Sequence, residues 1–370
     1  MRLRLFAFSC MFAASLFAPR LPAQAAQDEK PLRLAVAGLV HGHVDGFFHA
    51  VKARADVQIV GIFEPDRALQ QQYAKKYGFT DSIFFTDVDS MLSRVRPEAV
   101  AIFTNTFDHA AMVEACAKQH IHAMMEKPLA VSNEQARRIQ SAARDGGIQV
   151  IVNYETTWYR SHRAMWQLLK DQHAGGDIRK MVAMDGHEGP KEIHVGPEFL
   201  GWLTDPVKNG AGALFDFGCY GANLMTWMMD NQRPLSVTAT LQTFKPQIYS
   251  RVDDEANVLV EYPTAVGIIQ GSWNWPYGRK DFEVYADHAY AYAIGGNELD
   301  TRVGSQKQSA NTLEELPADE RDSVSYLKAV VRGRLKPAGL SSLENNMIVV
   351  QILDAARESA RTGQKVKLRP

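Results

Sequence analysis

The sequence is poor in cysteine, in unbalanced charge and in long apolar runs. It has 370 residues with three cysteines and a formal net charge of −1 at pH 7. No run of like charges, low-complexity tract or internal repeat is present. These absences exclude a disulfide scaffold and give no electrostatic footprint for nucleic acid or an anionic membrane. We expect Cys116 and Cys219 to be buried free thiols, although a single disulfide between them is an alternative.

The one apolar run lies at the N-terminus. Two arginines precede the apolar stretch 5–18, and a small-residue cleavage site, Ala-Gln-Ala, occupies residues 23–25. This order predicts a secretory signal peptide over residues 1–25. About 14 apolar residues are short for a membrane span of about 20. We therefore expect an exported protein, periplasmic or extracellular, with no stable membrane anchor.

From residue 31 the chain alternates between strand-like and helix-like segments. The expected strands are 33–40, 57–66, 82–87, 98–106, 120–128 and 148–154, with charged amphipathic helices between them. Such alternation predicts a parallel sheet with helices on both faces, the doubly wound α/β Rossmann architecture, over residues 31–153.

The rhythm changes after residue 154. Strands at 180–187, 235–246, 256–263, 266–275 and 281–296 follow one another with short turns, which predicts a mainly antiparallel sheet in an α+β domain over residues 154–345. One helix layer covers one face, so we expect the other face to pack against a second subunit in a homodimer or homotetramer. Residues 346–370 are expected to form a C-terminal helix and tail that return to the Rossmann domain.

The loop after the first strand resembles a dinucleotide-binding turn with altered glycines. It reads AVAGLVHGHVDG over residues 35–46, so Gly38 can make the tight turn while Val40 and His43 stand where further glycines are usual. Glu64 ends the second strand, where an acid accepts hydrogen bonds from the adenosine ribose and favours NAD over NADP. The loop and Glu64 together predict a cofactor site.

Two further motifs carry groups suited to acid–base chemistry. Glu126-Lys127-Pro128 ends the fifth strand, and Pro128 holds Lys127 extended toward the crevice where ligands bind such sheets. Asp216, Tyr220 and Asn223 have the spacing of one helix face. A surface lysine and a buried packing helix are the alternative interpretations.

These motifs resemble the Gfo/Idh/MocA family, the group of glucose–fructose oxidoreductase and inositol dehydrogenase. The resemblance covers nearly all of residues 31–370 and is specific in MMEKPLA, AIFTNTFDHA, GALFDFGCYGAN and ARESARTGQKVKL. It implies a Rossmann domain, an open-faced second sheet, bound NAD, and catalytic roles for Lys127 and Asp216. The expected cofactor-binding residues are Gly38, Val40, His41, Gly42, Glu64, Thr104, Asn105, His109, Glu126 and Lys127.

The chain departs from the commonest family pattern on the second-domain helix. Tyr220 and Asn223 stand where many members carry a histidine and its aspartate partner. The paired change is consistent, because a phenol that must ionise is hindered by a neighbouring carboxylate and helped by Lys127 and a positively charged cofactor. The resemblance is therefore to the branch with tyrosine in the acid/base position.

The sequence predicts an exported NAD-dependent oxidoreductase that takes hydride from a sugar, cyclitol or other polyol. Lys127 and Tyr220 are expected to relay the hydroxyl proton, and Asp216 to place the substrate. A redox-neutral, NAD-dependent glycoside hydrolase or lyase and a non-catalytic NAD- or sugar-binding protein are the alternatives. We expect no bound metal. The expected substrate-binding residues are Asn153, Trp158, Arg160, His187, Asn223 and Trp275.

Overall fold

The computed structural model describes residues 29–310 and 312–368. The predicted signal peptide lies outside these residues. Among the helices described, none combines the length and the apolar character needed to cross a membrane.

The first sheet is parallel and has the strand order β3-β2-β1-β4-β5-β6. This confirms the doubly wound fold, because the order reverses at β1 and the helices follow the strands. The strands are β1 (Leu32–Ala37), β2 (Val57–Phe63), β3 (Phe84–Phe85), β4 (Ala99–Ile102), β5 (His122–Glu126) and β6 (Val150–Asn153). The intervening helices are α2 (His43–Lys52), α3 (Arg67–Tyr77), α4 (Val88–Val95), α5 (His109–Lys118) and α6 (Asn133–Gly146).

Side-chain caps fix where several of these helices begin. Asp66 accepts hydrogen bonds from the backbone N–H groups of Ala68 and Leu69, and Ser132 accepts one from that of Gln135. The caps satisfy N–H groups that have no partner inside the first helical turn. Gly78 and Gly147 end α3 and α6 in the left-handed conformation that glycine adopts without strain.

The second sheet has the order β14-β13-β12-β11-β7-β10-β9-β8-β15 and is antiparallel except between β7 and β10. Its strands are β7 (Ile178–Gly186), β8 (Ser236–Gln242), β9 (Glu255–Glu261), β10 (Val266–Ser272), β11 (Arg279–Ala286), β12 (Ala289–Ile294), β13 (Glu298–Val303), β14 (Gln306–Ala310) and β15 (Val366–Lys367). The helices α7 (Arg160–Trp166), α8 (Pro197–Leu203), α9 (Ala213–Asp216) and α10 (Gly218–Met228) belong to this half.

The second sheet contains strands that the sequence did not reveal. The stretch 281–296, expected as one strand, is the hairpin of β11 and β12, and β13 and β14 extend it. These added strands are short and polar, with alternation too weak to separate them from loops. Outward-facing Leu259 and Tyr285 are each 37% exposed. The subunit contact expected on this face stays a prediction.

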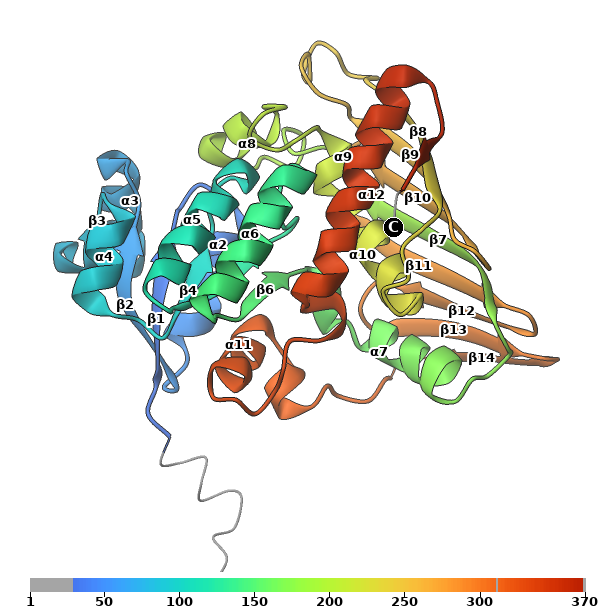
Figure 1. Cartoon of the computed structure of the whole chain (residues 1–370), viewed down its shortest axis with the longest axis horizontal. Helices are drawn as coiled ribbons and strands as arrows, with labels where there is room; N and C mark the ends of the chain where they lie inside the picture. Colours follow the sequence, from blue (N-terminus) through green and yellow to red (C-terminus); the bar gives the residue numbers. More distant parts are fainter. Residues whose placement is uncertain (1–28, 311, 369–370) are drawn as a thin grey trace, which may run out of the picture.

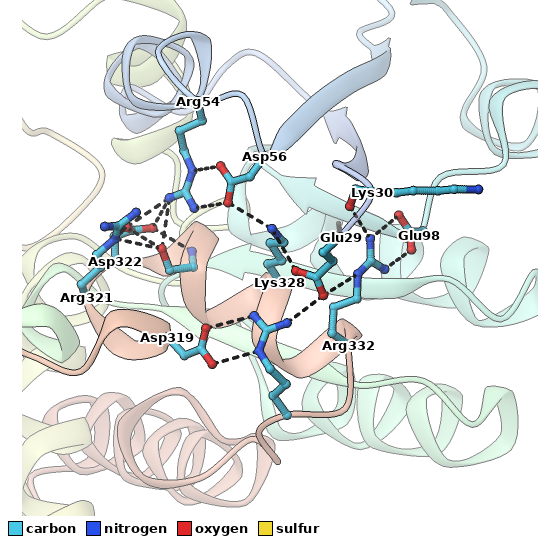
Figure 2. Close-up of polar contacts among 12 residues, drawn as sticks. Glu29, Lys30, Arg54, Asp56, Glu98, Asp319, Arg321, Asp322, Lys328 and Arg332 are labelled. Carbon is cyan, nitrogen blue, oxygen red and sulfur yellow. Dashed lines mark hydrogen bonds and ion pairs between the residues drawn. The ribbon is translucent and has the colours of Figure 1, made fainter. Parts of the chain in front are cut away.

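The C-terminal part contributes one helix to each half. The helix α11 (Ser323–Val331) packs into the core of the Rossmann domain, so the structure places it outside the second domain to which the sequence assigned it. Ion pairs border this contact, as Figure 2 shows for Lys328, Glu29 and Asp56, with Lys328 Nζ 3.1 and 3.3 Å from the two carboxylates. The helix α12 (Leu343–Thr362) runs between α6 and the second sheet (Figure 1).

Candidate active site

A cavity of about 490 Å³ opens where the carboxyl ends of β1 and β5 face α8, α9 and α10. Its lining includes Asp45, Gln72 and Tyr73 at one end and Lys127 and Tyr220 at the other. Ligands of doubly wound sheets bind outside these strand ends, near the point where the strand order reverses. The volume lies within the usual range for small-molecule and cofactor sites.

The turn after β1 is built around Gly38. Its φ of +89° is strained for residues with a side chain, and a Cβ there would lie 2.7 Å from Cγ2 and the backbone nitrogen of Thr104. Val40, His41 and Gly42 line the cavity, whereas Gly38 itself shapes the turn behind it. Since α2 begins at His43, the turn also presents a helix N-terminus to the cavity. The residues present therefore fit a dinucleotide, and this turn with the start of α2 would hold its pyrophosphate.

The helix α8 covers the same turn from the second domain. Phe199 lies against Gly42, where an added Cβ would approach its ring to 2.8 Å, and Trp202 Nε1 donates to the carbonyl oxygen of Val40 at 3.1 Å. The ring of His41 is 4.8 Å from that of Phe199. Aromatic side chains of α8 therefore pack directly against this turn.

Glu64, at the end of β2, holds the turn that follows β1. Its side chain is 2% exposed, and its two oxygens accept hydrogen bonds from the backbone N–H groups of Leu39 at 2.9 Å and Asp66 at 3.0 Å. Burial raises the pKa of its carboxyl group, and this effect outweighs the lowering by the two hydrogen bonds. Glu64 braces the turn and is not among the residues that line the cavity, and its contact with a ribose stays a prediction.

A chain of hydrogen bonds fixes Glu126 at the end of β5. His43 Nδ1 lies 2.8 Å from Oε2, Asn153 Nδ2 donates to Oε1 at 2.8 Å, and Trp158 Nε1 donates to Asn153 Oδ1 at 2.9 Å. His41, His43 and Glu126 place ligand-type atoms within 4.8 Å of one another. His41 Nδ1, however, accepts from the His43 N–H at 3.2 Å, which leaves the ring proton on Nε2. These contacts form a hydrogen-bond network that orients the carboxylate of Glu126.

The other predicted residues of the Rossmann half lie around this network. Thr104 and Asn105 form the turn after β4, where Asn105 Oδ1 accepts from the Asp108 N–H at 3.2 Å. His109 is fully buried, with Nδ1 3.3 Å from the carbonyl oxygen of Leu129. Burial lowers the pKa of His109 to about 4. These three residues support the loops that carry Gly38 and Lys127, and they are not among the residues that line the cavity.

Lys127 and Asp216 form a buried ion pair across the two domains. Lys127 Nζ lies 2.5 Å from Asp216 Oδ1 and donates to the Asp216 carbonyl oxygen at 2.8 Å. Trp273 Nε1 donates to the other carboxylate oxygen at 2.9 Å. Burial alone would lower the pKa of Lys127. The negative charge of Asp216 outweighs this effect, so the pKa of Lys127 is raised. Burial likewise raises the pKa of Asp216, and Lys127 reverses this to a net lowering. Both groups are therefore charged.

Tyr220 lies beneath two lysine ammonium groups. Lys127 Nζ is 5.0 Å and Lys280 Nζ 4.9 Å from the centre of its ring. Burial, followed by the negative charge of Glu155, raises the pKa of the Tyr220 phenol well above 10. Burial and the charge of Glu155 thus outweigh the expected help toward ionisation from Lys127, and Tyr220 is a neutral phenol.

Asp216, Tyr220 and Asn223 do not share one helix face. Phe217 separates α9 from α10, so Asp216 ends one helix and Tyr220 lies in the next. Asn223 is fully buried and donates to the carbonyl oxygen of Leu340 at 2.9 Å and to Asn345 Oδ1 at 2.8 Å. The structure therefore corrects Asn223 from a substrate-binding residue to a packing residue between α10 and α12.

The structure brings only His187 of the expected substrate-binding residues into the cavity. Its Nδ1 accepts from the Gly189 N–H at 2.9 Å, so the ring proton sits on Nε2. Asn153 and Trp158 belong to the Glu126 network, and Trp158 lines a different cavity. Arg160 bonds Asn297 and Glu315 at the surface, and Trp275 stacks on Arg279. Those four lie outside the lining of the cavity.

Three residues of the site are not among the expected site residues. Lys280 lines the cavity, Trp273 holds Asp216, and Phe199 covers the turn. Trp273 and Lys280 were visible in the sequence as part of SWNWPYGRKD, but nothing in that stretch indicated which side chain faces the crevice. Phe199 follows Pro197 at a helix start, a signal for structure and not for chemistry.

The comparisons with known proteins agree with this architecture. Residues 32–154 match the model of an oxidoreductase family with an NAD-binding Rossmann fold, and residues 162–292 match the GFO/IDH/MocA C-terminal domain. D-glucoside 3-dehydrogenase of Escherichia coli K12 is 22% identical over 363 residues, covering 93% of this chain and all of that enzyme. Trans-1,2-dihydrobenzene-1,2-diol dehydrogenase of Sus scrofa is 24% identical, over only 60% of either chain.

A solved structure shows the same fold. The inositol dehydrogenase homologue from Azotobacter vinelandii, complexed with NAD⁺, superimposes with a TM-score of 0.79 at 19% identity, covering 92% of this chain and 98% of that one. Both halves of the chain match models of one family, and the cavity at their junction has the features of a dinucleotide site. This chain therefore belongs to the Gfo/Idh/MocA family of NAD-binding oxidoreductases.

Proposed function

We propose that the protein is an exported NAD-dependent dehydrogenase that oxidises a secondary hydroxyl of a sugar or related polyol. The observation that carries the proposal is the buried Lys127–Asp216 pair, which joins the strand end of the Rossmann domain to the second domain inside the cavity. Two relatives named above are dehydrogenases of a D-glucoside and of a cyclic diol, which supports a substrate with ring hydroxyl groups.

The charges of the pair suit alcohol oxidation. Bound NAD supplies the hydride acceptor. The ammonium group of Lys127 stabilises the negative charge that develops on the hydroxyl oxygen, and Asp216, the carboxylate of the pair, accepts the hydroxyl proton. Tyr220, as a neutral phenol, donates a hydrogen bond to the same oxygen. His187 Nε2–H provides a second donor at the edge of the cavity.

The test separates the cofactor from the reaction. The purified mature protein is denatured and the supernatant is analysed for released NAD by mass spectrometry, and the refolded or cofactor-free protein is titrated with NAD. Steady formation of NADH with free sugars or methyl glycosides supports the dehydrogenase. Cleavage of a glycoside without net NADH identifies the redox-neutral alternative, and absence of nucleotide binding refutes both.

Export rests on the N-terminal pattern alone and has its own test. Expression of the full chain in a Gram-negative host, followed by fractionation and N-terminal sequencing, is expected to give periplasmic protein that begins at Ala26. Uncleaved protein in the cytoplasm contradicts export and leaves the proposed reaction untouched.

A further inference from the structure

A second cavity, of about 560 Å³, adjoins the candidate active site on the side of the second domain. His187, Phe217 and Lys280 line both cavities, so the two share a wall next to the Lys127–Asp216 pair. The far wall is formed by the loop between β10 and β11 and by the ends of β11 and β12. A substrate held at Lys127 can therefore extend into the second cavity.

Aromatic rings give this cavity its shape. Tyr277, 55% exposed, lies on the loop before β11, and Tyr159 and Tyr292 belong to other parts of the lining. The guanidinium carbon of Arg279 lies 5.9 Å from the centre of the Tyr277 ring and 4.6 Å from that of Trp275. This stacking fixes one side of the Tyr277 ring and reduces the cost of ordering it when a ligand packs on the other side.

The charged groups of the second cavity are paired with one another. Arg279 forms an ion pair with Asp281 at 2.7 Å, and Lys280 forms one with Glu155. Tyr159 also donates its hydroxyl hydrogen to Glu155 at 2.6 Å. Both cations of this lining are neutralised, so the cavity offers hydrogen-bond donors and acceptors without a net attraction for a phosphate or carboxylate.

We propose that this cavity, lined by Tyr159, Phe217, Tyr277 and Tyr292, binds the second ring of a neutral disaccharide-sized glycoside whose first ring reacts at Lys127. The proposal rests on the proposed function and specifies its substrate class. An apolar ring face opposite polar edge groups matches the two kinds of surface that a pyranose presents. The paired charges disfavour sugar phosphates and nucleotide sugars as substrates of this chain.

Binding is measured first, because it does not depend on turnover. Calorimetric titration of the NAD-saturated protein compares D-glucose, methyl β-D-glucoside, cellobiose, maltose, lactose and glucose 1-phosphate. At least one disaccharide is expected to bind about tenfold more tightly than glucose and more tightly than glucose 1-phosphate. Equal affinity for glucose and every disaccharide, or preference for glucose 1-phosphate, overturns the proposal. If the protein oxidises glucose but binds glucose and every disaccharide equally, the proposed function is kept and only the second-ring site is refuted.

Tyr277→Ala provides the matched variant, because its exposed side chain makes the substitution compatible with folding. The ratio of disaccharide affinity to glucose affinity is expected to fall about threefold to tenfold, the value of one aromatic contact. Phe244→Ala, at a position 57% exposed and outside the lining of both cavities, is the control and is expected to keep the wild-type ratio. An unchanged ratio in Tyr277→Ala overturns the assignment of this cavity, whatever the reaction proves to be.

Discussion

Replacing one partner of the Lys127–Asp216 pair leaves a buried charge without compensation. Both side chains are at most 6% exposed. Lys127→Met keeps an unbranched side chain one atom shorter and removes its charge, and Asp216→Asn keeps an oxygen that accepts from Trp273. Each single substitution is expected to lower the free energy of unfolding by about 3–5 kcal/mol, the usual cost of breaking a buried pair.

The double variant distinguishes this reasoning from simple loss of packing. With both charges absent, no buried ion remains unpaired, so its destabilisation is expected to be smaller than the sum of the single effects by about 2–3 kcal/mol. Urea unfolding of the cofactor-free protein, followed by circular dichroism and tryptophan fluorescence, supplies the four free energies. If circular dichroism and fluorescence report different unfolding transitions, the free energies are taken from the transition that the substitutions shift.

The pH dependence supplies a second check. Because the pKa of Asp216 is lowered in the folded protein, the pair's contribution is present above the unfolded pKa of about 4 and is lost as pH falls through the folded pKa. The coupling is therefore expected to be full near about pH 7 and to decrease in strong acid. Additive single effects, or single effects below about 1 kcal/mol as for exposed pairs, refute the reasoning.

Three further changes test other parts of the molecule. Asp185 is fully buried and its carboxyl oxygens lack partners among the described residues, and burial raises its pKa well above its usual value. The wild-type protein therefore loses stability as pH rises through the folded pKa of Asp185. Thermal unfolding should show Asp185→Asn to be more stable than wild type near about pH 8 and closer to wild type near about pH 4. Equal stability profiles of the two proteins contradict a buried acid. Gly38→Ala should weaken NAD binding at least tenfold in a fluorescence titration because of the strained φ and the contact with Thr104, and unchanged affinity would show that the turn relaxes. Tyr220→Phe should lower kcat about 10²-fold or more while NAD affinity stays within about twofold, and a wild-type kcat removes Tyr220 from the reaction.

The strand–helix rhythm was readable because each element carries its own local signal. The runs before Gly38 and Lys127 are apolar and short, and the helices between them begin at capping residues such as Asp66 and Ser132. Parallel strands buried on both faces need such continuous apolar segments. The six-stranded order follows from right-handed crossovers, so fold class and the location of the crevice could be predicted.

The sequence was less informative where side chains choose between two partners. Glu64 stands at the position of a ribose ligand, and its two carboxylate oxygens also accept hydrogen bonds from the backbone N–H groups of Leu39 and Asp66. Asn223 lies in the same helix as Tyr220, but the break at Phe217 separates Asp216 from that helix, and α12 provides Asn345 as the partner of the Asn223 side chain. The Leu39–Glu64 contact joins residues 25 positions apart and the Asn223–Asn345 contact joins residues 122 positions apart, so no local pattern indicated either of them.

The sequence by itself determined the two-domain architecture, because the periodicity of strands and helices is a local property of the chain. Its motifs also resemble the Gfo/Idh/MocA family, and that resemblance implied that Lys127, Asp216 and Tyr220 lie near one crevice. Only the tertiary structure decided the electrostatic state of that crevice. Lys127 and Asp216 are separated by 89 positions in the chain and meet at 2.5 Å. Their charges, and the neutral phenol of Tyr220, result from burial and from neighbours that folding brings together.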